Sequence, residues 1–398
     1  MNRIKELDGI RGLAVLMVLI YHYFNLLSFP WAVGGSLLAR LHNFTHWFWS
    51  GVDLFFVLSG YLIGGIIIDN RESKNFLPVF YIRRALRILP AYSLLLIAYF
   101  VLRSQLEPAR FGALFYGTAT IFPAFSYFTF TQNIFLGLAY VMHRDPNMFL
   151  APTWSLAVEE QFYLIVPFLL LVVRRKYWTN LLIGLVILAL ILRTLFPIFS
   201  PYFITPFRMD SLFFGVLVAL AVRQPCLRAW LEEKKWILRS AFLLLLVIVA
   251  LIVVKGILKW PAIEYSVLAC FYAVLILIAA IESGTLHLAI FRFSPLRFLG
   301  LISYSLYLFN LPILWLFHGL ILGTSPSLNS WNGCVITLFS LTVTIALASA
   351  SYFFFERYFL SVGHSVHYER PGKSPFAESG TRNVRIPAKS EPRVKTLG

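Results

Sequence analysis

The segment RGLAVLMVLIYH places Arg11 and His22 at the two ends of an apolar run. At about 100° per residue, eleven residues make three helical turns plus about 20°, so both side chains share a helix face, roughly 16 Å apart. A guanidinium can bind phosphate through its planar fork, and an imidazole can accept a proton near neutral pH. The pair could mark two ends of one reaction path. A snorkelling Arg11 and an interfacial His22 explain it equally well.

Carboxylates follow in two further apolar segments. Asp53, in GVDLFFVLSGYLI, falls at the depth expected for His22, where it could orient the imidazole; an acidic residue is also ordinary near a helix start. Glu159 and Glu160, in PTWSLAVEEQFYLIVP, lie about one and a half turns inside a helix, where a lipid-facing position would be costly. The catalytic candidates are therefore His22, Asp53, Glu159 and Glu160.

A cluster of arginines in YIRRALRILP precedes the third apolar segment. Arg84 and Arg87 are three residues apart and share a helix face. Their planar forks suit phosphate, although a basic cluster at this place also serves as a topology signal. With Arg11, the two form the predicted binding site for a phosphate-bearing co-substrate.

Further polar residues fall near or inside other apolar segments. Arg208 and Asp210, in PFRMDSLFFG, could position a substrate or pair with Glu159 or Glu160. SYSLYLFNLP carries a polar cluster that ends before Pro312 and predicts a lined cavity beside a kink. The predicted substrate-positioning residues are Trp154, Tyr163, Arg208, Asp210, Tyr307 and Asn310.

These residues require a membrane-embedded helical scaffold. The chain has 398 residues, of which 59% are hydrophobic, more than a soluble domain of this size can bury. Long apolar runs, rather than short alternating ones, exclude a β-barrel and predict an all-α polytopic membrane protein. We predict about ten spans, at residues 7–25, 50–68, 88–104, 154–173, 180–198, 206–222, 237–254, 261–282, 298–320 and 332–355.

The charge distribution predicts the orientation of these spans. The net charge is +16, and Lys and Arg cluster in short loops between apolar runs, which indicates membrane orientation rather than nucleic-acid binding. Both termini are therefore predicted to be cytoplasmic. Residues 111–142 are read as a non-crossing or re-entrant element, since an extra crossing would place the basic residues 174–176 outside. Residues 1–360 form the predicted membrane domain and 361–398 a disordered basic cytoplasmic tail. The three widely spaced cysteines fit no metal pattern.

Several of these motifs, in this order, resemble those of the acyltransferase 3 family of membrane O-acyltransferases. The matching features are an Arg and a His separated by ten residues, GVDLFFVLSGYLI, Arg-x-x-Arg, WSLAVEEQFYLIVP, RMDSLFFG, SYSLYLFNLP and YFFFERYFL. Relatives often have Trp-His where this chain has Phe309-Asn310, and an asparagine cannot take up a proton near neutral pH. If His22 is the catalytic base, Asn310 is a positioning residue.

The resemblance implies transfer of an acyl group, often acetyl, from acyl-CoA to a hydroxyl of a cell-envelope glycan or lipid-linked sugar. It implies acyl-CoA as a co-substrate, no tightly bound cofactor, and a multi-pass protein of a bacterial inner (plasma) membrane, where lipid is a further partner. Two other functions stay open from the residues. One is a secondary transporter, although the sequence has no internal repeat typical of many transporters. The other is a catalytically silent scaffold in glycan assembly.

Overall fold

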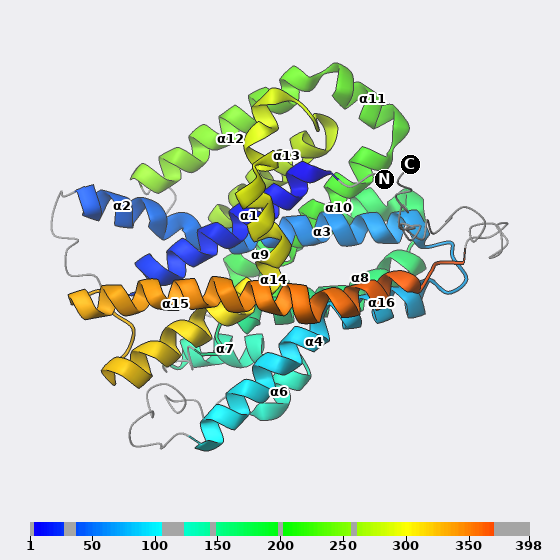
Figure 1. Cartoon of the computed structure of the whole chain (residues 1–398). Coiled ribbons are helices and arrows are strands. Elements are labelled where there is room, and N and C mark those ends of the chain that lie inside the picture. The colour runs from blue at the N-terminus through cyan, green and yellow to red at the C-terminus, as the bar shows by residue number, and fades with distance from the viewer. Residues whose placement is uncertain are drawn as a thin grey trace, which may run out of the picture.

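A computed structural model describes residues 4–27, 37–105, 123–143, 149–197, 202–255 and 261–369. Its elements within these ranges are all helices, arranged as one bundle (Figure 1). The long helices are α1 (Lys5–Ile20), α3 (Gly51–Asn70), α4 (Phe76–Gln105), α8 (Thr153–Val172), α9 (Trp178–Leu195), α10 (Met209–Arg223), α12 (Lys235–Lys255), α13 (Pro261–Ile281), α14 (Ser294–Phe317) and α15 (Trp331–Ala350). Shorter helices are α2 (Leu37–His46), α6 (Ala124–Phe128), α7 (Gln132–Val141), α11 (Pro225–Glu233) and α16 (Arg357–Ser365).

The number of membrane-spanning helices agrees with the prediction. Within the described residues, nine helical segments are long and apolar enough to cross a membrane. A tenth is formed if α10 and α11, which meet at a 90° bend, count as one broken span. The prediction of an all-α polytopic membrane protein with about ten spans is confirmed.

Helix α4 begins earlier than predicted. It starts at Phe76 rather than near residue 88, so Arg83, Arg84 and Arg87 lie inside the helix and not before it. Pro78 falls in the first turn, where the missing backbone N–H breaks no intrahelical hydrogen bond. The arginine, alanine and leucine residues that follow all favour helix. The side chains of these arginines therefore project from a rigid helix.

The segment predicted not to cross the membrane is described in part. Helices α6 and α7 have 5 and 10 residues. Because the hydrocarbon core needs about 20 helical residues, neither helix is long enough to cross it. Helix α7 packs against α8. Residues 106–122, which include much of the remainder of the predicted element, lie outside the described ranges.

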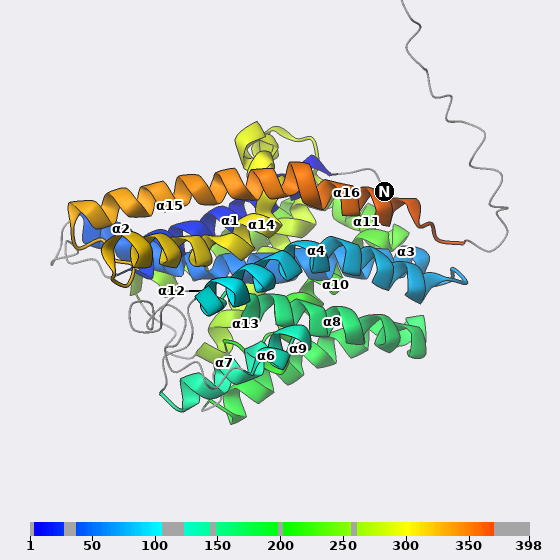
Figure 2. The same cartoon turned by 60° about the horizontal axis from the view of Figure 1, so that its bottom comes forward.

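The predicted domain boundary at residue 360 falls inside helix α16. Helix α16 continues to Ser365, and residues 366–369 bind to the start of α4. Figure 2 shows α15 and α16 as one continuous rod, joined by the π-helical turn η8 (Ser351–Glu356), lying over α14 and α4. The rest of the predicted tail, residues 370–398, lies outside the described ranges.

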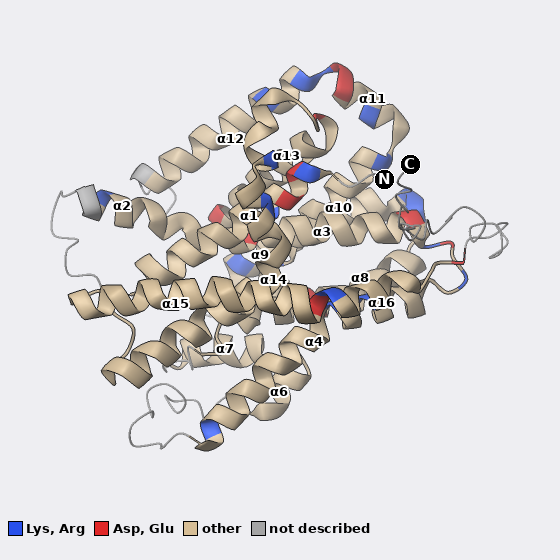
Figure 3. Ribbon diagram, viewed as in Figure 1, with Lys and Arg blue, Asp and Glu red and all other residues tan. Residues whose placement is uncertain are grey.

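Basic residues gather at one end of the bundle. Figure 3 shows Lys and Arg at the ends of α3 and α10, on α11 and beside α16, on the side opposite the start of α15. The loops that the sequence places on one side of the membrane thus share one end of the structure. That this end is cytoplasmic remains a prediction from the positive-inside rule.

Two helix pairs approach closely through glycine. A Cβ atom at Gly60 of α3 would lie 1.9 Å from the backbone oxygen of Leu212, and one at Gly215 of α10 would lie 2.1 Å from that of Val57. Helices α1 and α14 approach similarly at Gly12 and Gly300. Small residues drive helix association in lipid because they let backbones touch. These four helices carry Arg11, Asp53, Asp210, Tyr307 and Asn310, which are considered below.

We expect Gly60→Val to weaken the α3–α10 contact. The added side chain must displace backbone, and overpacking of this kind costs about 1–3 kcal/mol or more. Gly184→Val on α9 is the matched control, because a Cβ there meets nothing within 4 Å. Thermal unfolding of the two variants in detergent measures the difference. Equal melting temperatures would show that α3 and α10 do not pack as described.

Candidate active site

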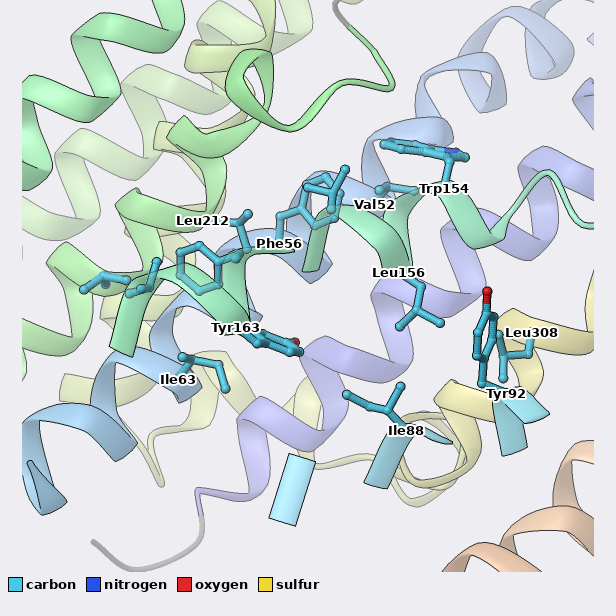
Figure 4. Close-up of a cluster of buried hydrophobic side chains, with 14 of the residues drawn as sticks. Val52, Phe56, Ile63, Ile88, Tyr92, Trp154, Leu156, Tyr163, Leu212 and Leu308 are labelled. Atoms are coloured by element: carbon cyan, nitrogen blue, oxygen red, sulfur yellow. The ribbon is translucent and has the colours of Figure 1, made fainter. Parts of the chain in front are cut away.

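A cavity of about 370 Å³ runs through the bundle between α1, α3, α4, α8 and α14. Its lining residues on α3 extend from Val52 to Asn70, which corresponds to roughly 27 Å along the helix. Figure 4 shows part of its apolar wall, which includes Val52, Phe56, Ile63, Ile88, Leu156, Tyr163 and Leu308. The cavity thus reaches from the basic end of the bundle almost to the opposite end of α3.

The three arginines predicted to bind phosphate all line this cavity. We call Arg11, Arg84 and Arg87 the cavity arginines. Within the described residues none of them forms a hydrogen bond or an ion pair, and the Nε atom of Arg84 is buried without a partner. The Arg84 guanidinium lies 5.8 Å from the ring centre of Tyr163. Glu159 and Asp69 also line the cavity, but neither forms an ion pair with these arginines, and three such cations constitute a site for an anion.

A chain of hydrogen bonds crosses the cavity wall between α3 and α8. The Ser59 hydroxyl donates to Glu159 Oε1 at 2.5 Å and lies 2.9 Å from the Tyr163 hydroxyl. All three residues line the cavity. Glu160 is not a lining residue, and its Oε1 atom is buried without a partner among the described residues. The two adjacent carboxylates therefore face different surroundings, as adjacent positions on a helix require.

His22 is bound by Asn310. The His22 Nδ1 and Asn310 Oδ1 atoms are 2.5 Å apart. The Asn310 amide nitrogen donates to the backbone oxygens of Leu306 and Tyr307, which can only accept. The amide oxygen must therefore accept from His22, so the proton lies on Nδ1 and the lone pair of Nε2 is free. Asn310, which is fully buried, sets the tautomer of a potential base.

Arg11 and His22 are placed differently relative to the cavity. The α-helical spacing ends at Tyr21, where the chain enters the π-helical segment η1 (Tyr21–Asn25). Arg11 lines the cavity, whereas His22 is not among the described residues that line it. Tyr307 lies between the cavity and the partner of His22. It lines the cavity and precedes Asn310 by three residues, about 4.5 Å along α14.

The prediction that Asp53 orients His22 is wrong. Asp53 Oδ1 instead accepts from Arg208 at 2.6 Å and from Ser211 at 3.0 Å. Asp53 and Arg208 are fully buried, and the guanidinium lies 4.3 Å from the ring centre of Tyr265. A buried carboxylate needs a full positive charge beside it, which Arg208 supplies and a neutral histidine would not.

The other predicted positioning residues divide into two groups. Tyr163 and Tyr307 line the cavity. Asp210 instead forms a buried pair with Arg193 at 2.7 Å and accepts a hydrogen bond from Ser266. Trp154 is buried against the ring of Tyr202, 4.8 Å between centroids. Arg208, Asp210 and Trp154 are thus structural neighbours of the cavity and do not line it, and neither Arg208 nor Asp210 pairs with Glu159 or Glu160.

Sequence reasoning missed several polar partners. Arg193 is fully buried inside a predicted span, which by itself signals a required carboxylate partner. Glu356 accepts hydrogen bonds from Ser305 at 2.5 Å and Ser351 at 3.2 Å, and its place in the last apolar segment carries the same signal. Ser59 is small enough to be taken for a packing residue, and no pattern in the sequence distinguishes it.

We expect Arg208→Met to destabilise the protein strongly. It leaves Asp53 buried without its cation, which costs about 3–5 kcal/mol. Adding Asp53→Asn should restore much of that loss, because the unpaired charge is then absent. Arg228→Met is the control, since its pair with Glu232 is exposed and such pairs contribute about 0.3–0.5 kcal/mol. Thermal unfolding in detergent measures the stability of each variant. A double variant no more stable than Arg208→Met would contradict the expectation.

Comparisons with known proteins agree with this geometry. The chain is 29% identical over 368 residues to peptidoglycan O-acetyltransferase OatA of Listeria monocytogenes, covering 89% of this chain and 55% of that protein. It is 27% identical over 367 residues to O-acetyltransferase OatA of Staphylococcus aureus, covering 88% and 56%. The chain thus spans little more than half the length of these relatives. No solved structure matches it. Residues 4–351 match the family described as an acyltransferase domain, and the chain belongs to this acyltransferase 3 family.

Proposed function

We propose that this protein is a membrane O-acetyltransferase that moves an acetyl group from acetyl-CoA to a hydroxyl of a cell-envelope glycan or lipid-linked sugar. The observation that carries the proposal is the cavity, which has uncompensated arginines along it and leads toward a histidine of fixed tautomer. The name of the Listeria monocytogenes relative includes peptidoglycan, which makes that polymer the first acceptor to test. The membrane is then the inner (plasma) membrane of a bacterium.

The cavity arginines are the proposed binding site for the phosphates of CoA. They lie nearer the basic end of the bundle, where a cytoplasmic nucleotide would enter. The apolar wall beyond them, formed by residues such as Ile63, Ile88 and Leu156, suits the thin pantetheine arm. Ser59, Glu159 and Tyr163 offer hydrogen-bonding groups along the same path. The thioester then approaches the turn of α14 that carries Tyr307 and Asn310.

His22 is the proposed general base. Its Nε2 atom takes the proton of the acceptor hydroxyl as the oxygen attacks the thioester carbonyl carbon. The new C–O ester bond forms, the C–S bond breaks, and the proton passes from His22 to the departing CoA thiolate. Asn310 holds the imidazole through Nδ1 during both transfers. It thereby performs the orienting role predicted for Asp53, although as a neutral amide it adds no charge to stabilise the imidazolium.

A cavity through a helical bundle also suits a transporter, and an inactive scaffold would keep the same fold. Transfer of radiolabel from acetyl-CoA to envelope material, with purified protein in vesicles, separates these functions. A transporter or scaffold leaves the acceptor unlabelled, whereas the proposed enzyme labels it.

The donor site predicts the effect of two substitutions. Arg84→Ala and Arg87→Ala should each weaken CoA binding by about tenfold or more, since a charge-assisted phosphate contact contributes roughly 1.5–3 kcal/mol. Lysine at either position should restore the affinity only in part, because a point charge replaces a fork. Arg174→Ala, in an exposed loop, should leave it unchanged. Titration of CoA into each variant measures its affinity. Unchanged affinity of the Arg84→Ala and Arg87→Ala proteins would show that these arginines only set the orientation of the helix in the membrane.

The base assignment predicts a sharper loss. His22→Ala and His22→Gln should both lower the transfer rate by about 10²–10⁴-fold, because glutamine preserves hydrogen bonding but takes up no proton near pH 7. His287→Gln, at an exposed site outside the cavity lining, is the control. Label transfer by protein of verified melting temperature is the measurement. Near-normal transfer by His22→Gln would leave His22 with a positioning role only.

A further inference from the structure

A second, smaller cavity of about 160 Å³ adjoins the first one. Ile66, Arg84 and Arg87 line both cavities, so a ligand held by these arginines can extend from one cavity into the other. The remaining lining residues come from α4, from α16 and from the segment that follows it: Phe80, Arg83, Leu360, Gly363, His364 and Tyr368. The last four lie beyond residue 351, where the family match ends.

The segment after α16 is fixed in place by its own hydrogen bonds. The Asn75 amide donates to the His367 carbonyl at 3.0 Å and accepts from the Glu369 N–H at 2.8 Å. The Val366 carbonyl accepts from Nε and Nη2 of Arg83, at 2.9 and 2.6 Å. This carbonyl holds the Arg83 guanidinium, whose carbon lies 4.8 Å from the Tyr368 ring centre. The cavity is therefore a built site and not a gap between mobile chains.

The ionisable nitrogen-bearing side chains that line the smaller cavity are all basic. Arg83, Arg84, Arg87 and His364 all line it, and no carboxylate is among its described lining residues. Arg83 and Arg87 are four residues apart on one helix face, a spacing at which like charges repel. Arg84 and Arg87 have no ion partner elsewhere in the described chain. An anion in this cavity would offset the repulsion, and guanidinium forks are suited to a phosphate with three terminal oxygens.

We propose that this cavity is a phosphate-monoester site, built by residues 360–368 against α4, that takes the 3′-phosphate of the acyl-CoA ribose. The inference rests on the proposed donor. The diphosphate would lie along Arg84 and Arg87 in the larger cavity, and the ribose phosphate would lie in the smaller one, beside Arg83 and His364. The segment that follows the family domain would then determine whether the enzyme accepts the complete coenzyme.

The test compares CoA with 3′-dephospho-CoA, which lacks only this phosphate. The full-length protein in detergent should bind CoA about tenfold tighter or more, as expected for a charge-assisted contact. Arg83→Gln and His364→Ala should abolish this preference while leaving the affinity for 3′-dephospho-CoA unchanged. Arg83→Gln also releases Val366, so His364→Ala, at an exposed helix position, provides an independent test that keeps this segment fixed. Arg357→Gln, exposed on α16 and outside both cavities, should keep the preference.

The outcomes distinguish this inference from the proposed function. Equal affinity of the wild-type protein for both nucleotides would overturn the 3′-phosphate site and leave the donor proposal standing. Failure to bind either nucleotide would overturn both. Phosphatidic acid has a monoester head group as well, so it is added as a competitor. If it displaces CoA but not 3′-dephospho-CoA, the two monoesters compete for one site, as the inference requires. If it binds in a manner that depends on His364 yet displaces neither nucleotide, the cavity binds a lipid phosphate and the nucleotide assignment is wrong.

Discussion

A charge in the hydrocarbon layer must be neutralised, and this requirement organises the interior of the bundle. Arg208 and Asp53 are both fully buried, and so are Arg193 and Asp210, and in each case the partner comes from a different part of the chain. Removing one member of such a pair would strand the other in a medium of low dielectric constant. The pairs thereby fix how α3, α9 and α10 face one another. The three cavity arginines differ from these pairs, because within the described residues they face a cavity without forming an ion pair.

Close contacts between helices hold the side chains around the cavity in fixed positions. Glycine at the α3–α10 and α1–α14 crossings lets the backbones touch, so the side chains on either side of each crossing have little freedom. Helix α1 supplies Arg11 and the π-helical segment that continues it supplies His22, while α14 supplies Tyr307 and Asn310. The hydrogen bond between His22 and Asn310 thus joins two segments that are already held together by packing. Pre-organisation of this kind lowers the cost of reaching the reactive arrangement.

The sequence predicts the helical class, most of the spans and the charged residues Arg11, Arg84, Arg87 and Glu159 of the cavity, because hydropathy and intramembrane charge are local signals. The choice of ion-pair partner is not a local property of the sequence. Equal depth predicts a contact between Asp53 and His22, but depth does not specify which neighbour a side chain faces, and Arg208 lies 155 residues away along the chain. Arg193 is an isolated charge in an apolar run, and the sequence does not identify its partner. The start of α4 lies earlier than hydropathy predicts, because a basic turn at a membrane boundary has no hydropathy signal, although its residues favour helix.

The π-helical turn at Tyr21–Asn25 has a genetic consequence. The Leu26 N–H bonds to the Tyr21 carbonyl five residues earlier, at 2.9 Å, so this turn holds one residue more than an α-helical turn. Loss of one codon here would restore the α-helix and rotate the residues that follow by about 100°, without disturbing the packing of the preceding α1 turns.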